Sequence, residues 1–286
     1  MSTQPTTQFA QVNGIRIAYE VTGSGLPMLM LHGHPRTHRS WEKVTPLLSS
    51  RFTLVKPDRR GYGDSDRGSP PEAYENANMA ADAVGLMDDL GFDKFMVVGH
   101  DKGAPTARRI AQDHHDRVPG AVILDGMPEG VDVPRQRDTS GRTWYFDFFR
   151  QRGVAEQIME RDPGLFWGLF LDRNPHLTAE ERAFYVAHFS KPGSVDAVLA
   201  DYRAGMEVDS VYWSEQVASG RKIETPLCLL WGGRGPTANA PVLEAWGQIA
   251  KDVRGQAIED SAHYIQEEQP AALADHILRF ADELGV

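Results

Sequence analysis

The sequence has almost no cysteine, since Cys228 is the only one among 286 residues. A single thiol excludes an internal disulfide framework and any metal site built from several cysteines. Long apolar runs are also lacking, and no stretch approaches the roughly 20 apolar residues that cross a bilayer as a helix. Residues 1–8 are polar and lack the basic segment and apolar run of a secretion signal. We therefore expect a cytoplasmic protein with no membrane partner.

Basic residues are too few to balance the acidic ones. Lys and Arg total 30 against 40 Asp and Glu, which gives a formal net charge of −10. A field of this sign repels polyphosphate, so nucleic acid is not expected as a partner. The length of the chain suits one large domain or one domain that carries a sizeable insertion. The composition leaves the oligomeric state open, a homodimer included.

The order of apolar runs indicates an α/β fold. In the first third of the chain, short apolar runs alternate with helix-like segments, a pattern typical of a mostly parallel sheet flanked by helices. The expected strands are 28–31, 53–56, 95–98, 121–124, 227–231 and 253–258, and the closing amphipathic helix is 271–284. The pattern between Met127 and Lys222 is aromatic-rich and helical. We expect a helical cap at 128–221, inserted into a core formed by 1–127 and 222–286.

A strand-turn-helix motif surrounds Asp101. The apolar strand runs into residues 99–103 (Gly-His-Asp-Lys-Gly), and a helix-like segment follows. This is the form of a nucleophile elbow, in which two glycines allow a sharp turn that raises one side chain above the sheet. The N–H groups of the following helix favour an anion at that point. We predict that Asp101 is a nucleophile; the alternative is that it only caps the helix.

An aspartate nucleophile restricts the reaction. A serine that attacked a saturated carbon would leave an ether, whereas a carboxylate leaves an ester that water can hydrolyse. Asp101 therefore favours displacement at saturated carbon, with an epoxide oxygen or a halide as the leaving group. Hydrolysis of the ester needs a base, and His263 follows the last expected strand, as the base does in chains with this elbow. The alternative for His263 is a core or surface histidine.

Several motifs together resemble one known family. Residues 32–35 read His-Gly-His-Pro, residues 58–65 read Asp-Arg-Arg-Gly-Tyr-Gly-Asp-Ser, and the elbow at 99–103 and the late His263 follow in order. The whole chain resembles the α/β-hydrolases with an aspartate nucleophile, in the branch of epoxide hydrolases and of haloalkane and fluoroacetate dehalogenases. The resemblance implies the α/β-hydrolase fold, a cap over the sheet and no cofactor.

The resemblance also nominates an acid to orient the base. Many α/β-hydrolases place it after the penultimate strand, but residues 230–236 contain no acid. The other known position is the end of the preceding strand, which is Asp125 here. The role expected of Asp125 is to orient His263. The alternative is that it caps the turn into the insertion.

Two backbone N–H groups should hold the oxygen of Asp101 that becomes negative during ester hydrolysis. One is expected from Lys102, and the loop at 32–35 nominates His34 for the other. The turn at 58–65 is expected to support this loop. Because His32, His34 and His38 cluster in the sequence, a metal site is the alternative. No acidic or cysteine ligand accompanies these histidines at a metal-motif spacing, so no metal is expected.

The cap carries two candidate tyrosines. Residues 201–205 (Asp-Tyr-Arg-Ala-Gly) match the cap tyrosine motif of both groups, which points to Tyr202. Epoxide hydrolases of this fold use two cap hydroxyls to protonate the epoxide oxygen, and Tyr145 suits the second position. The alternative for Tyr145 is an aromatic cap core. The residues expected to line the substrate pocket are Trp144, Phe146, Phe149 and Trp231.

The sequence restricts the identity of the substrate less than it restricts the type of reaction. Fluoroacetate dehalogenases hold the substrate carboxylate with two arginines after the nucleophile, where this chain has Lys102 and Pro105. A single cation cannot reproduce that bidentate clamp. We therefore favour an epoxide hydrolase whose partners are a small epoxide and water. The alternatives are a dehalogenase of haloacids and, in another class, a non-catalytic member of the fold that binds a ligand.

Overall fold

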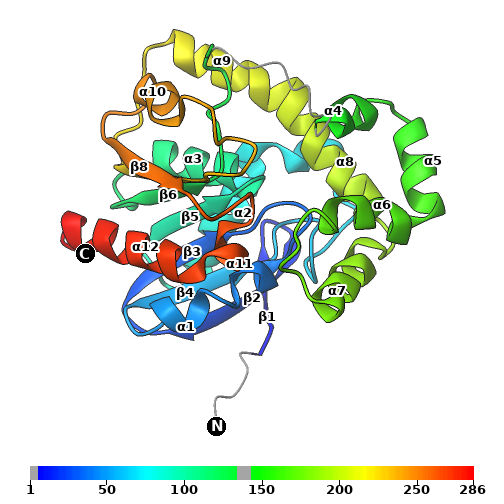
Figure 1. Cartoon of the computed structure of the whole chain (residues 1–286), viewed down its shortest axis with the longest axis horizontal. Helices are drawn as coiled ribbons and strands as arrows, with labels where there is room; N and C mark the ends of the chain where they lie inside the picture. The colour runs from blue at the N-terminus through cyan, green and yellow to red at the C-terminus, as the bar shows by residue number, and fades with distance from the viewer. Residues whose placement is uncertain (1–5, 134–142) are drawn as a thin grey trace.

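An eight-stranded sheet forms the centre of the molecule in a computed structural model that describes residues 6–133 and 143–286 (Figure 1). The strands are β1 (Gln8–Val12), β2 (Ile15–Gly23), β3 (Leu26–Leu31), β4 (Phe52–Pro57), β5 (Met96–His100), β6 (Ala121–Leu124), β7 (Leu227–Gly232) and β8 (Val253–Ile258). Their order is β1-β2-β4-β3-β5-β6-β7-β8. β2 pairs antiparallel with β1 and β4, and the other neighbours are parallel. The predicted α/β-hydrolase fold, with a mostly parallel sheet, is confirmed.

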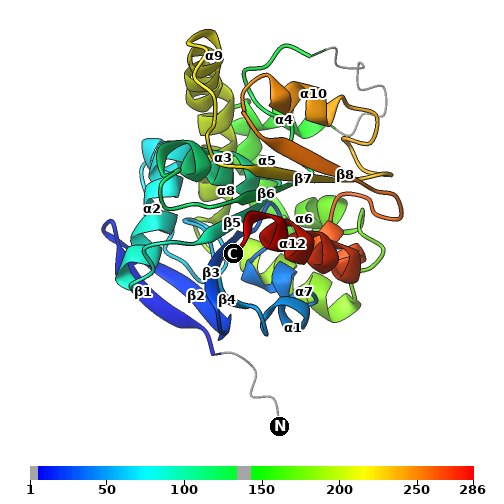
Figure 2. The same ribbon diagram turned by 90° about the vertical axis from the view of Figure 1, so that its left-hand side faces the viewer.

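Helices cover both faces of the sheet, because successive side chains of a strand point to opposite sides. Met28 and Met30 of β3 face a cluster that includes Trp41 and the apolar side of a C-terminal helix. Leu29 and Leu31 face the opposite cluster. On the first face lie η1 (His38–Trp41), α1 (Thr45–Leu48) and α12 (Pro270–Leu284), and on the second lie α2 (Asn76–Asp89), α3 (Gly103–Asp113) and α10 (Val242–Gly247) (Figure 2).

A helical segment separates β6 from β7. Its elements are α4 (Trp144–Phe149), α5 (Val154–Arg161), α6 (Pro163–Leu171), α7 (Ala179–Phe189), α8 (Ser194–Ala204), the π-helical turn η3 (Gly205–Asp209) and α9 (Ser210–Ala218). In Figure 1, α4 to α8 gather to one side of the sheet. They enclose their own aromatic core, which includes Phe149, Trp167 and Tyr202. We call this helical segment the cap; its bounds as a domain, 128–221, stay a prediction, and residues 134–142 lie outside the described residues.

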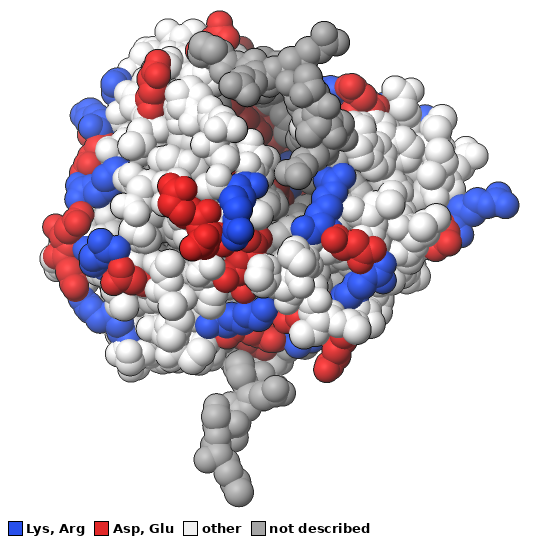
Figure 3. Space-filling model, in the orientation of Figure 1, with Lys and Arg blue, Asp and Glu red and all other residues white. Residues whose placement is uncertain are grey.

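Two further short elements are η2 (Pro71–Tyr74), between β4 and α2, and α11 (Ile265–Glu268), between β8 and α12. Over residues 6–133 and 143–286, no helix is both long enough and apolar enough to span a bilayer. Acidic and basic side chains are interspersed over the face in Figure 3, so the excess of acid does not form a single-sign patch there.

Candidate active site

Asp101 occupies a sharp turn between β5 and α3. The strand ends at His100 and the helix begins at Gly103, and Asp101 between them has a φ of 49°. A Cβ on Gly103 would lie 2.3 Å from the carbonyl oxygen of Leu31, so only glycine fits this close approach of the turn to β3. The turn leaves 22% of the Asp101 side chain exposed. Such a carboxylate is within reach of a small substrate.

The two oxygens of the Asp101 carboxylate have different partners. The backbone N–H of His34 donates a hydrogen bond to Oδ1 at 2.8 Å, and Nε2 of His263 lies 3.4 Å from Oδ2. Burial raises the pKa of Asp101, but the hydrogen bond and charge of His263 outweigh burial and hold this pKa well below its usual range. Asp101 is therefore ionised at neutral pH, as a carboxylate nucleophile must be.

His263 lies between Asp101 and Asp125. Its Nδ1 is hydrogen-bonded to Oδ2 of Asp125, which directly follows β6 in a left-handed conformation with a φ of 48°. The other oxygen of Asp125 accepts a hydrogen bond from the hydroxyl of Thr237. Burial lowers the pKa of His263, but the hydrogen bonds to the two carboxylates and their charges raise it well above the ordinary value. The structure thus brings the predicted nucleophile, base and acid together, and adds Thr237.

His100 contacts the backbone of His263. Its Nε2 lies 2.8 Å from the carbonyl oxygen of His263, and the side-chain amide of Gln266 lies 3.1 Å from its Nδ1. Because a carbonyl oxygen only accepts, Nε2 must carry the hydrogen and Nδ1 must accept from Gln266. Burial lowers the pKa of His100 to about 3, which keeps the ring neutral. The sequence did not indicate this contact.

Lys102 extends from the turn toward the cap. Its Nζ lies 3.0 Å from Oδ1 of Asp201 and 3.1 Å from the carbonyl oxygen of the same residue in α8. Its backbone N–H makes no hydrogen bond to Asp101 within the described part of the chain. The role of that N–H in holding an oxyanion stays a prediction, and Asp201 is a contact that the sequence did not indicate.

Tyr202 is buried and lies close enough to Asp101 for the charge of that carboxylate to act on its hydroxyl. Only 4% of the residue is exposed, and the ring of Tyr145 lies edge-on at a centroid distance of 5.9 Å. Burial raises the pKa of Tyr202 well above 10, and the charge of Asp101 and the neighbouring Tyr145 raise it further. The Tyr202 hydroxyl makes no hydrogen bond to any described residue. The two predicted tyrosines therefore share one region of the cap.

The predicted pocket residues divide between two places. Phe146 and Phe149 of α4 pack against the Tyr202 ring at centroid distances of 5.8 and 4.9 Å. Trp144 is 39% exposed and packs against other rings of the cap. Trp231 is different, because it packs against the sheet cluster that contains Trp246. The structure does not bring Trp231 into the aromatic cluster of the cap.

The side chains of the three clustered histidines contact different neighbours. Nε2 of His32 accepts a hydrogen bond from the N–H of Arg59 at 3.1 Å, and Nδ1 of His38 lies 2.8 Å from Asp58. The ring of His34 is enclosed by aromatic rings, Tyr202 among them. Over the described ranges, no group of three or more His, Cys, Asp or Glu is placed to hold a metal ion.

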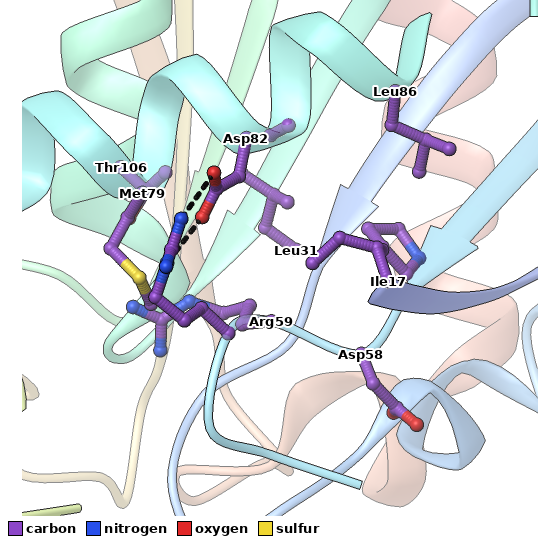
Figure 4. Close-up of a pocket in the computed structure, with 11 residues that line it drawn as sticks. Ile17, Leu31, Asp58, Arg59, Met79, Asp82, Leu86 and Thr106 are labelled. Carbon is purple, nitrogen blue, oxygen red and sulfur yellow. Dashed lines mark hydrogen bonds and ion pairs between the residues drawn. The ribbon is translucent and has the colours of Figure 1, made fainter. Parts of the chain in front are cut away.

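The turn at 58–65 packs behind the loop that carries His34. Oδ1 of Asp58 accepts a hydrogen bond from the N–H of His38 at 2.8 Å, and Arg60 forms an ion pair with Asp82 at 2.7 Å. A cavity of about 10 Å³ lies beside this turn and is lined in part by Arg59 and Asp82 (Figure 4). A volume of this size holds about one water molecule, so the cavity is too small for a substrate.

Comparisons with known proteins agree with this geometry. Residues 27–270 match the family described as alpha/beta hydrolase fold. A soluble epoxide hydrolase from Corynebacterium sp. (strain C12) is 32% identical over 289 residues, which cover 98% of each chain. A fluoroacetate dehalogenase from Burkholderia sp is 32% identical over 238 residues, 80% of this chain and 78% of that protein.

Solved structures show the same architecture. A protein described as a putative alpha/beta hydrolase from Nostoc sp PCC 7120 superposes with a TM-score of 0.90 at 33% identity, over 98% of this chain and 99% of that one. The epoxide hydrolase CorEH superposes with a TM-score of 0.88 at 30% identity, over 98% of this chain and all 100% of that one. At these identities the likeness extends beyond the fold to the family.

Proposed function

The chain belongs to the α/β-hydrolase fold family and is a hydrolase, and we propose that it opens an epoxide to a diol through a covalent ester on Asp101. The observation that carries this proposal is the set of partners around the Asp101 carboxylate. One oxygen is held by the His34 N–H, the other faces His263, and the Tyr202 phenol lies in the field of the same charge. This arrangement suits attack on carbon in one step and hydrolysis in the next.

In the first step, Asp101 attacks an epoxide carbon. Because Oδ1 is held by His34, Oδ2 forms the new carbon–oxygen bond while the bond from that carbon to the epoxide oxygen breaks. The epoxide oxygen leaves as an alkoxide and needs a proton. A phenol is acidic enough to supply one to an alkoxide, even with its pKa raised by burial as in Tyr202. We assign this proton transfer to Tyr202, with Tyr145 as the second donor.

Formation of the ester prepares His263 for the second step. The pKa of His263 is raised by the charges of both Asp101 and Asp125. Esterification removes the charge of Asp101, so the pKa of His263 falls and the ring can release its proton, which balances the proton that the Tyr202 phenol gave up and must regain. Neutral His263 then takes one proton from water, and the water oxygen attacks the ester carbonyl. The intermediate expels the diol oxygen, which takes up the other proton of the water, and the Asp101 carboxylate and the imidazolium are restored. Oδ1 becomes negative in this step and is already hydrogen-bonded to the His34 N–H.

A haloacid dehalogenase is the second candidate because of the 32% identity to the fluoroacetate dehalogenase. That reaction needs a group to hold the substrate carboxylate. The cation next to the nucleophile is Lys102, and both oxygen contacts of its Nζ go to Asp201. A lysine already paired with a carboxylate is a poor ligand for a second one. This pairing supports the epoxide over the haloacid. A purely ligand-binding protein would not need Asp101, His263 and Asp125 in one chain of contacts.

The test compares two leaving groups in single-turnover alkylation. Tyr202→Phe and Tyr145→Phe should each slow alkylation by styrene oxide by about one to three orders of magnitude, since a lost donor costs about 2–4 kcal/mol in comparable sites. Chloroacetate should respond much less, because a halide needs no proton. Tyr212→Phe in α9 is the matched control and should behave like the parent. The epoxide proposal is wrong if both cap variants alkylate normally with styrene oxide while the parent turns over haloacetates faster than epoxides.

A further inference from the structure

Lys102, which follows the proposed nucleophile, forms an ion pair that attaches the cap to the turn at Asp101. We infer that Lys102 is a positioning residue: by binding α8 at Asp201, it holds the hydroxyl of Tyr202 at the nucleophile. The inference rests on the proposed function, in which Tyr202 protonates the leaving oxygen. It assigns to Lys102 a role in specifying a leaving group that takes up a proton, rather than a role in binding a substrate carboxylate.

Lys102 contacts two consecutive residues of α8. Its Nζ lies 3.0 Å from Oδ1 of Asp201, 3.1 Å from the Asp201 carbonyl oxygen and 4.9 Å from the centre of the Tyr202 ring. Only 13% of the Lys102 side chain is exposed. A Cβ on Gly205 would lie 3.1 Å from this Nζ, so the end of α8 leaves room for the ammonium group. The cap surface is therefore shaped to receive this side chain.

Asp201 is held on its other side as well. Its Oδ2 lies 3.2 Å from Nη1 of Arg59 and accepts a hydrogen bond from the hydroxyl of Tyr62 at 2.6 Å. Burial raises the pKa of Asp201, but the charges of Lys102 and Arg59 outweigh burial and lower it. The carboxylate thus stays ionised while 2% exposed. It is a fixed anchor to which the turn at Asp101 is attached through Lys102.

The ion pair between Lys102 and Asp201 restrains the distance between Tyr202 and Asp101, on which proton transfer to the leaving oxygen depends. Lys102 is joined to Asp101 by one peptide bond, and Asp201 is joined to Tyr202 in the same way. The ion pair therefore restrains the proton donor relative to the nucleophile across the boundary between cap and sheet. Loss of Lys102 leaves Asp201 paired with Arg59 and Tyr62, so no buried charge becomes unpaired. We expect the fold to survive Lys102→Met.

A double-mutant cycle tests whether Lys102 acts through Tyr202. Lys102→Met should slow single-turnover alkylation by styrene oxide on the order of tenfold to a hundredfold, the effect of a displaced catalytic group. In a Tyr202→Phe background, the same substitution should have little further effect, because no donor remains to be positioned. Lys102→Arg, which keeps a cation, should recover most of the rate. Hydrolysis of the preformed ester should be unchanged, since it depends on His263, Asp125 and backbone N–H groups, and the substitution of the Lys102 side chain keeps the backbone N–H of that residue.

The control is Lys191→Met. Lys191 pairs with Asp64 at 2.6 Å, also between cap and core but at a distance from Tyr202 in the sequence and in its contacts, so this variant should alkylate like the parent. Lys102→Gln takes the place of Lys102→Met in the same cycle if the latter does not fold. The inference is overturned if the effects of Lys102→Met and Tyr202→Phe multiply, or if Lys102→Met loses chloroacetate turnover and keeps epoxide alkylation. Normal alkylation by Tyr202→Phe alone would instead overturn the proposed function.

Discussion

At the scale of single residues, His263 is the group whose charge must change during the proposed reaction. In the free enzyme it lies between two carboxylates, 3.4 Å from Asp101 and in direct contact with Asp125. The two carboxylates raise the pKa of His263, and the hydrogen bond and charge of His263 in turn lower the pKa of Asp101. The resting pair is therefore an imidazolium and a carboxylate. This state suits alkylation, whereas hydrolysis of the ester needs the neutral imidazole.

The two steps should accordingly depend on pH in different ways. Alkylation needs ionised Asp101, and because the pKa of this group is lowered, its rate should stay constant as the pH falls from about 9 to 5. Ester hydrolysis needs neutral His263, so its rate should rise with pH until the histidine of the ester form has lost its proton. Rapid-quench measurement of each step separates the two profiles. An alkylation rate that falls in acid over this range would contradict the assignment.

Asp125→Asn changes the second step alone. The substitution removes a charge that raises the pKa of His263, so the rise of ester hydrolysis should move to lower pH. The rate at the plateau should fall by about a hundredfold or more, because the imidazole loses the carboxylate that orients it. Alkylation should change little. Asp275→Asn, on the exposed side of α12, is the matched control and should leave both steps unchanged.

Local sequence could predict some residues of the site and not others. Asp101 follows from the elbow, because a strand, two glycines and a helix lie in one short segment. The contact of Asp125 with His263 joins residues 138 positions apart, and here the order of residues in a known family was needed. Thr237 and His100 could not be predicted, because nothing in their own segments indicates the distant atoms that they contact.

At the scale of elements, the turn at Asp101 is where three parts of the site meet. The residue before Asp101, His100, contacts the backbone of His263, and the residue after it, Lys102, contacts α8. Gly33 lies so close that a Cβ there would be 2.4 Å from Cβ of Asp101. The loop at 32–35, the loop that carries His263 and the cap are thus all in contact with the turn at Asp101.

Elements with continuous apolar character were predictable, and those that depend on neighbours were not. The six expected strands correspond to β3 to β8. Most residues of β3 to β7 are buried and apolar, as in a parallel strand covered on both faces, whereas β8 is an edge strand of mixed residues. The hairpin of β1 and β2 was not expected, since its polar and apolar residues are mixed. The π-helical turn η3 at the end of α8 also has no local signal. Its first residue, Gly205, lies next to the ammonium group of Lys102.

At the scale of the whole molecule, one buried ion pair joins three regions around the site. Arg36 follows the loop at 32–35, and its guanidinium binds both oxygens of Glu267 in α11 at 2.6 and 3.0 Å. The side-chain amide of Asn174, in the cap, donates to the same carboxylate at 2.6 Å. The Arg36 side chain is 0% exposed. The cap is therefore attached to the core at this point as well as at Asp201.

Arg36→Met should destabilise the protein strongly. The substitution leaves Glu267 as a buried charge without its cation, and breaking a buried pair in this way costs about 3–5 kcal/mol. Urea denaturation followed by circular dichroism measures the change in the free energy of unfolding. Arg182→Met is the matched control, because the Arg182–Asp172 pair lies at the surface and its loss should change stability much less. Equal losses of unfolding free energy in the two variants would contradict the stabilising role of the buried Arg36–Glu267 pair.

The central claim is that turnover passes through an ester on Asp101. The most direct measurement is the intact mass of a His263→Ala variant after exposure to styrene oxide, followed by peptide mapping. Alkylation does not need the base but hydrolysis does, so the variant should accumulate an adduct with the mass of one epoxide on the peptide that contains Asp101. The double variant Asp101→Asn with His263→Ala should show no adduct. An unmodified His263→Ala protein, obtained under conditions in which the parent enzyme turns over the epoxide, would contradict the account.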